Sequence, residues 1–146
     1  MALKLSSKGE NALRALITLG QHQGELLTVK EIADLSLVTM KYMEQIILLL
    51  KINGYVLGKR GANGGYTLHL PPNQINIGEV IRKLEGPLAP MGCVSETAYE
   101  ACLLEPNCLL KPLWKRVRDQ IAFVLDQTTL ADLLEQKLTN QLVNTI

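Results

Sequence analysis

Two short helices joined by a three-residue turn, with a glycine-rich hairpin directly after them, are the strongest structural signal in this chain. Thr28 opens the first helix with a capping box, because its hydroxyl can accept the amide of Glu31 while the Glu31 carboxylate reaches back. Thr39 opens the second helix, whose apolar residues recur with the helical period. That apolar face comprises Met40, Met43, Ile46, Ile47 and Leu50. Two helices of this length and so short a turn are typical of a helix-turn-helix.

The segment after Asn53-Gly54 changes from helical to strand-like character. Residues 55–57 and 66–70 predict two short strands, with a glycine-rich turn over residues 58–65. A hairpin directly after the second helix of a helix-turn-helix is a wing. The expected fold class is therefore mainly α, a winged helix-turn-helix with a small β-hairpin wing.

Further helices are expected on both sides of this unit. The first spans residues 6–20, and another begins at the cap Asn76 and stops at Gly86-Pro87. Residues 88–108 lack a clean period and predict a loop with one helical turn. After Pro112, an apolar stripe predicts a long C-terminal helix, which we expect to form a dimer interface. Its residues are Leu113, Trp114, Val117, Ile121, Val124 and Leu125.

A last helix is expected from Thr129, with Leu133, Leu134 and Leu138 on its apolar face. We find neither internal repeats nor a linker between separate domains. The expected organisation is one domain with three parts. These are a winged helix-turn-helix DNA-binding region over residues 1–86, a cysteine cluster loop over 87–111, and the dimerisation and C-terminal helices over 112–146.

Composition narrows the classes of protein. With 47% hydrophobic residues the chain can build a packed core, and with 4% aromatic residues that core must be mainly aliphatic. No apolar stretch is long enough to span a membrane, and the N-terminus lacks the apolar region of a signal peptide. We therefore expect a cytoplasmic protein without a membrane partner. Although the net charge is only +1, residues 1–60 are mildly basic and residues 79–110 acidic.

The helix-turn-helix and the wing predict binding to double-stranded DNA. A helix fits the major groove, where its polar side chains can touch base edges, while lysines and arginines hold phosphates. Glycines in the wing let the backbone approach the duplex, and an adjacent arginine can enter the minor groove. The alternative is an ordinary surface hairpin whose glycines serve only the turn. The predicted DNA-binding residues are Thr28, Thr39, Lys41, Tyr42, Glu44, Gln45, Lys59, Arg60, Gly61, Asn63 and Gly64.

Three cysteines, Cys93, Cys102 and Cys108, fall within sixteen residues. An odd number argues against a disulfide framework, and structural zinc sites usually have closely paired cysteines, which are missing here. The longer spacings favour an iron–sulphur cluster, 2Fe–2S over 4Fe–4S, with the thiolates as ligands. Zinc, redox-active thiols and buried thiols remain alternatives. A redox enzyme working through Cys102 and Cys108 would need a neighbouring base or a C-x2-C motif, so no enzyme is expected.

Together these segments resemble the Rrf-two family of winged-helix transcriptional regulators. The resemblance covers about residues 3–138 and implies a homodimer whose long C-terminal helix crosses its mate, with a cluster that tunes DNA affinity. It depends on eight motifs in order, with the three cysteines before the last two of them. These motifs are Leu5-Ser6-Ser7-Lys8-Gly9, Ala12-Leu13-Arg14-Ala15-Leu16, Tyr42-Met43-Glu44-Gln45, Arg60-Gly61-Ala62-Asn63-Gly64-Gly65-Tyr66, Gly78-Glu79-Val80-Ile81, Leu84-Glu85-Gly86-Pro87, Leu113-Trp114 and Thr129-Leu130-Ala131-Asp132.

Two departures from the family concern the cluster ligands. The gap between Cys93 and Cys102 is longer than the family's usual gap. Three residues after Cys108, where the family's iron–sulphur biogenesis regulators have a histidine ligand, this chain has Lys111, which cannot ligate while protonated. In the family's nitric-oxide sensors, an acidic residue on the first helix of the other subunit completes the set, and that position matches Glu10. The resemblance therefore implies a regulator that senses iron–sulphur or redox status, and the alternative is a cluster-free regulator switched by thiol oxidation or a protein partner.

Overall fold

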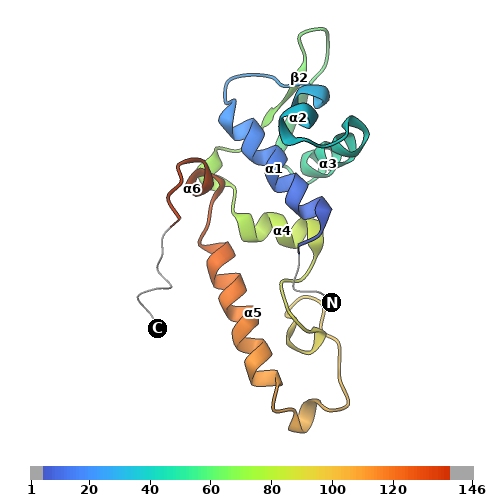
Figure 1. The fold of residues 1–146 in the computed structure, drawn as a ribbon, viewed down its shortest axis with the longest axis vertical. Coiled ribbons are helices and arrows are strands. Elements are labelled where there is room, and N and C mark those ends of the chain that lie inside the picture. The colour runs from blue at the N-terminus through green and yellow to red at the C-terminus, as the bar shows by residue number, and fades with distance from the viewer. Residues whose placement is uncertain (1–4, 139–146) are drawn as a thin grey trace.

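The structure, a computed structural model, describes residues 5–138. Helix α1 (Ser7–Gln21) lies at the centre of the winged-helix unit, in the upper half of Figure 1. Ser6 caps this helix by accepting the Gly9 amide at 3.3 Å. Because the buried face of α1 includes the small Ala12 and Ala15, neighbouring helices can approach closely. Those neighbours are α2 (Val29–Ser36), α3 (Met40–Ile52), α4 (Ile77–Glu85) and α6 (Leu130–Leu134).

The hairpin consists of β1 (Val56–Lys59) and β2 (Gly65–Leu68), paired antiparallel with Lys59 opposite Gly65. Its root is attached to the segment between α1 and α2, because Leu27 and Tyr66 exchange backbone hydrogen bonds of 3.0 and 2.7 Å. The predicted wing is confirmed, although both strands are displaced by one or two residues from the expected ranges.

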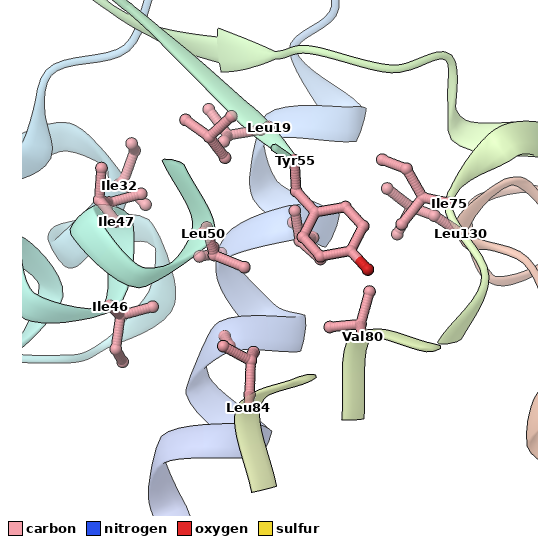
Figure 2. Packing of buried hydrophobic residues seen from close by; sticks show 14 of the residues in the cluster. Leu19, Ile32, Ile46, Ile47, Leu50, Tyr55, Ile75, Val80, Leu84 and Leu130 are labelled. Carbon is pink, nitrogen blue, oxygen red and sulfur yellow. The ribbon is translucent and has the colours of Figure 1, made fainter. Parts of the chain in front are cut away.

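The core lies between the helix-turn-helix, α1 and α4, and Figure 2 shows side chains from all of these converging there. It is mainly aliphatic, as the composition predicts. Tyr55 is the exception, with its ring packed among Leu19, Leu50 and Val80 and its buried hydroxyl without a partner among the described residues. Burial is the main reason why the pKa of Tyr55 is raised. The largest fully buried side chains include Leu16, Ile32, Met43, Ile46, Ile47, Ile75 and Leu130.

Beyond the core, the chain leaves α4 in a loop with two 3-10 turns, η2 (Gly92–Val94) and η3 (Glu105–Asn107). It then forms α5 (Lys111–Asp126), which extends away from the winged-helix unit (Figure 1). α6 returns the chain to the core, where the Leu130 amide donates to the Ile75 carbonyl at 2.9 Å. A further 3-10 turn, η1 (Pro72–Gln74), precedes α4.

The C-terminal end of α5, which lies nearest the winged-helix unit, is fastened to α4. Arg82 donates two hydrogen bonds to Asp126, at 2.6 and 2.8 Å, and the Asn76 side chain donates to the Asp126 carbonyl at 2.7 Å. Gly78 leaves room for this contact, because a Cβ there would collide with the Asp126 carboxylate. α5 is thus anchored at its C-terminal end and projects from that anchor.

Three expectations about elements need correction. The long helix begins at Lys111, because a proline is tolerated in the first turn, where its missing amide has no helical partner. The cysteine loop contains two short helical turns where one was expected. The last helix ends at Leu134, so Leu138 lies outside it, and Gln136 has a φ of +56° that breaks the helical path. Residues 139–146 of the expected C-terminal part lie outside the described residues.

Candidate DNA-binding surface and cysteine loop

A threonine cap begins each of the two helices of the helix-turn-helix. Thr28 and Glu31 form the predicted capping box, with hydrogen bonds of 3.2 and 2.7 Å, and Thr39 accepts the Tyr42 amide at 3.3 Å. Between them Leu37 adopts the left-handed conformation with a φ of +56°, which ends α2. The hydroxyls of both threonines are therefore engaged in helix capping, and their contact with DNA stays a prediction.

The outward face of α3 carries most of the residues predicted to contact DNA bases. Lys41, Glu44 and Gln45 are exposed, whereas Tyr42 is partly packed against the core. Met40 was expected on the buried face, and this was wrong: half of it is exposed, because the first turn of α3 extends past the packing of α1 and α2. Leu48 and Ile52 are also exposed apolar side chains on α3. The outward face of this helix is therefore mainly polar at its start, where Met40 is the exposed apolar residue, and partly apolar toward its end.

The wing presents a basic tip on a tight turn. Lys59, Arg60 and Asn63 are exposed there. Gly61 has a φ of +111°, and the Gly64 amide closes the turn on the Gly61 carbonyl at 3.0 Å. A Cβ on Gly64 would collide with the Lys59 carbonyl, so glycine is required at that position by the turn itself. Of the predicted wing residues, Gly61 and Gly64 shape the turn, whereas the side chains of Lys59, Arg60 and Asn63 are exposed and their contact with DNA stays a prediction.

The cysteine loop leaves the end of α4, and its first 3-10 turn, η2, packs against α5. Cys93 is half-buried in η2, Cys102 is exposed, and Cys108 is half-buried directly after η3. Arg118 of α5 holds the loop by donating to the Val94 carbonyl at 2.7 Å.

Glu105, between the second and third cysteines, organises this part of the loop. Its carboxylate accepts hydrogen bonds from the Tyr99 hydroxyl, at 2.6 Å, and from the Lys111 ammonium. Lys111, followed by Tyr99, holds the pKa of Glu105 below its ordinary value, and Glu105 in turn raises the pKa of Lys111. Lys111 therefore stays protonated, which agrees with its exclusion as a ligand.

The predicted ligands are not gathered within one protomer. Among residues 5–138, no three His, Cys, Asp or Glu side chains are grouped as metal ligands would be. Glu10 is exposed on α1, where it pairs with Arg14 at 3.0 Å and lines an open hollow of about 630 Å³ with Leu37. Its expected role as a ligand from the partner subunit stays a prediction.

Sequence reasoning missed two contacts that connect α4 to other elements. One is the Arg82–Asp126 pair described above. The other is the carboxylate of Glu85, which accepts hydrogen bonds from the start of α1. The partners are 44 or more residues apart in the sequence, so no local pattern could have indicated them.

No helix in the described part of the chain has the length and apolarity to cross a membrane.

Comparison with known proteins identifies the family of this chain. The model of the Rrf2 family, described as an iron-dependent transcriptional regulator, matches residues 5–136. The chain is 39% identical over 132 residues to the HTH-type transcriptional regulator CymR of Bacillus subtilis, covering 90% of this chain and 89% of that protein.

Solved structures agree with this result. The structure of CymR, the global cysteine regulator of B. subtilis, matches with a TM-score of 0.74 and 36% identity over 94% of this chain and 99% of that one. IscR of T. potens matches with a TM-score of 0.72 and 32% identity, covering 97% and 96%. The oxidised form of Staphylococcus aureus CymR matches with a TM-score of 0.72 and 35% identity, covering 90% and 96%. With its winged helix-turn-helix confirmed and the family model matching nearly the whole chain, this protein belongs to the Rrf2 family of transcriptional regulators, which are DNA-binding proteins and not enzymes.

Proposed function

We propose that this chain is a homodimeric regulator that presents two recognition helices and two wings to one operator, and that its three cysteines set its affinity for DNA. The observation that carries the DNA-binding part is the combination of a polar, exposed start of α3 with a basic wing tip attached to the same unit. The side chains assigned to the duplex are Thr28, Thr39, Lys41, Tyr42, Glu44, Gln45, Lys59, Arg60 and Asn63, with Gly61 and Gly64 shaping the wing.

The test of this surface is operator binding by charge-removing variants. Genomic fragments bound by the wild-type protein are selected first, and their affinity is then measured at several salt concentrations. Arg60→Ala should weaken binding by about 1–3 kcal/mol if it enters a groove. Arg116→Ala, which removes an exposed positive charge on α5, is the matched control. Binding that is insensitive to both salt and Arg60 would overturn the assignment.

The dimer is supported by the surface of α5. None of the side chains of this helix is fully buried in the protomer, although Leu113 and Val124 are large and apolar. A helix that projects from the core with an apolar face is most simply covered by the same helix of a second copy, as in two-fold DNA-binding dimers. Two copies would place two α3 helices on successive half-sites.

An iron–sulphur cluster suits the chemistry of Cys93, Cys102 and Cys108, because thiolates are the ligands such clusters prefer. The family description as an iron-dependent regulator also supports it. Within one protomer the thiols are not gathered for such binding, so the loop has to close around the cluster. When bound, a cluster supplies a centre that is sensitive to oxidants and to iron supply. The protein would contribute the three thiolates and the carboxylate of Glu10 from the partner subunit as ligands. A 2Fe–2S cluster is favoured over a 4Fe–4S cluster.

Anaerobic purification tests the cluster. A brown protein with visible absorption and about stoichiometric iron and sulphide supports it, and Cys93→Ala, Cys102→Ala or Cys108→Ala should each abolish stable binding. Glu10→Ala should still assemble a cluster, because three thiolates remain, but its absorption and its lifetime in air should change. A Glu10→Ala protein identical to the wild type in both would exclude Glu10 as a ligand.

A cluster-free thiol switch is the second candidate. The specific observation in its favour is that Cys102 is exposed, so oxidants can reach it without any opening of the core. Relatives described as a cysteine regulator and as an oxidised form are consistent with it. A protein that is colourless after anaerobic purification and loses operator affinity reversibly on oxidation would select this candidate over the cluster.

A further inference from the structure

The carboxylate of Glu85 fastens the end of α4 to the start of α1. Its Oε1 atom accepts the Ser6 amide at 3.1 Å, the Gly9 amide at 3.0 Å, and the Ser6 hydroxyl. Amides at a helix start have no partner within the helix and carry partial positive charge, so a carboxylate is well suited to them. A side chain from the fourth helix thus caps the first helix, across 76 residues of sequence.

The close approach of the two helices depends on Gly9. This residue is buried, and a Cβ on it would collide with the Oε1 atom of Glu85. The motifs Leu5-Ser6-Ser7-Lys8-Gly9 and Leu84-Glu85-Gly86-Pro87 therefore meet in space, and each supplies one half of the same contact.

Glu85 is also the last residue of α4 before the cysteine loop. Gly86, with a φ of +99°, turns the chain directly after it, and Pro87 follows. On the other side of the contact, α1 packs against both α2 and α3. Glu85 therefore lies where the loop that carries the thiols joins the helices that carry the DNA-binding surface.

We propose that Glu85 is the positioning residue that transmits the state of the cysteine loop to the helix-turn-helix. This inference depends on the proposed function, because it assumes that the thiols control DNA affinity. A change in the path of the loop at Gly86 rotates the last turn of α4, and hydrogen bonds weaken steeply when their length or angle changes. Withdrawal of the carboxylate uncaps α1 and lets it shift together with α2 and α3, which pack on it. The DNA-binding unit then has two arrangements, and the state of the loop determines which of them is favoured.

The experiment compares operator affinity before and after alkylation of the thiols in the full-length protein, purified with a chelator and a reductant so that all three thiols are reduced and free of metal. In the wild type the two affinities should differ by about 5- to 150-fold, the usual size of a coupling between sites. In Glu85→Ala the ratio of the affinity before alkylation to the affinity after it should be at least about fivefold smaller than in the wild type. Glu85→Gln, which keeps an acceptor but loses the charge, should lie between them. Ser6→Ala tests the same contact from α1. Glu79→Gln on the exposed side of α4 is the control and should keep the wild-type ratio.

A second readout separates transmission from simple stabilisation. In protein labelled with ¹⁵N-glycine, the amide signal of Gly9 should move on alkylation in the wild type and should not respond in Glu85→Ala. If Glu85 only stabilised the fold, its loss would lower the free energy of unfolding and leave the affinity ratio unchanged. An unchanged ratio in both Glu85→Ala and Ser6→Ala would overturn the inference. A wild type whose affinity ignores alkylation would overturn the thiol-switch proposal, and this inference with it.

Discussion

Replacement of apolar residues on the outward face of α5 should weaken the dimer without weakening the protomer. Leu113 and Val124 are 50% and 40% exposed in the protomer, so roughly half of each side chain is left to be covered by a partner. Full burial of such a side chain is worth about 1.5–3 kcal/mol, and the remaining half therefore contributes about 1 kcal/mol. Because a two-fold interface contains each residue twice, Leu113→Ala should cost about 2 kcal/mol, or about 30-fold in the dimer dissociation constant.

Sedimentation equilibrium over a dilution series measures that constant directly. Leu57→Ala on β1 is a matched control, because Leu57 is 48% exposed but lies on the wing. Leu113→Glu should act more strongly, since an unpaired charge would be buried at the interface. Urea unfolding at low protein concentration checks that the protomer is intact. The reasoning is refuted if Leu113→Ala and Val124→Ala both dimerise as the wild type does, or if Leu57→Ala weakens the dimer equally.

Other predictions concern stability. Leu37→Gly should stabilise the protein by about 1 kcal/mol in urea unfolding, because the left-handed conformation is strained for a residue with a side chain and the Leu37 side chain is 93% exposed. A destabilised variant would mean that contacts of the Leu37 side chain stabilise the fold by more than this strain. Asp126→Asn should reduce stability at neutral pH, because Arg82 holds the pKa of Asp126 below its ordinary value. The contribution of ionised Asp126 to the free energy of unfolding is complete above about pH 3.9 and is lost as the pH falls through the lower folded-state pKa. The urea midpoints of the variant and the wild type should therefore converge in acid and differ at neutral pH. Leu130→Ala should cost about 2–5 kcal/mol, since Leu130 is fully buried where α6 returns to the core; a cost below about 1 kcal/mol in the same assay would show that α6 is dispensable to the core.

Local signals in the sequence were sufficient for the helix-turn-helix and its wing. The caps at Thr28 and Thr39 depend on residues three positions away, and the wing turn depends on glycines within it, so both could be recognised without knowledge of the rest of the fold. The helical period also assigned most buried residues of α3 correctly. It failed at Met40, because a period identifies a face of a helix but not how far the neighbouring helices extend along it.

What the sequence determined by itself was therefore the set of elements, the family and the presence of three thiols in one loop. Only the tertiary structure decided which residues meet across long separations, as Arg82 does with Asp126 and Glu85 with Gly9. It also decided that Lys111 pairs with Glu105 and that the thiols are not gathered within one protomer. The physical reason is that caps, turns and helical periods are set by neighbours along the chain, whereas these contacts exist only after packing has brought separate helices and loops together.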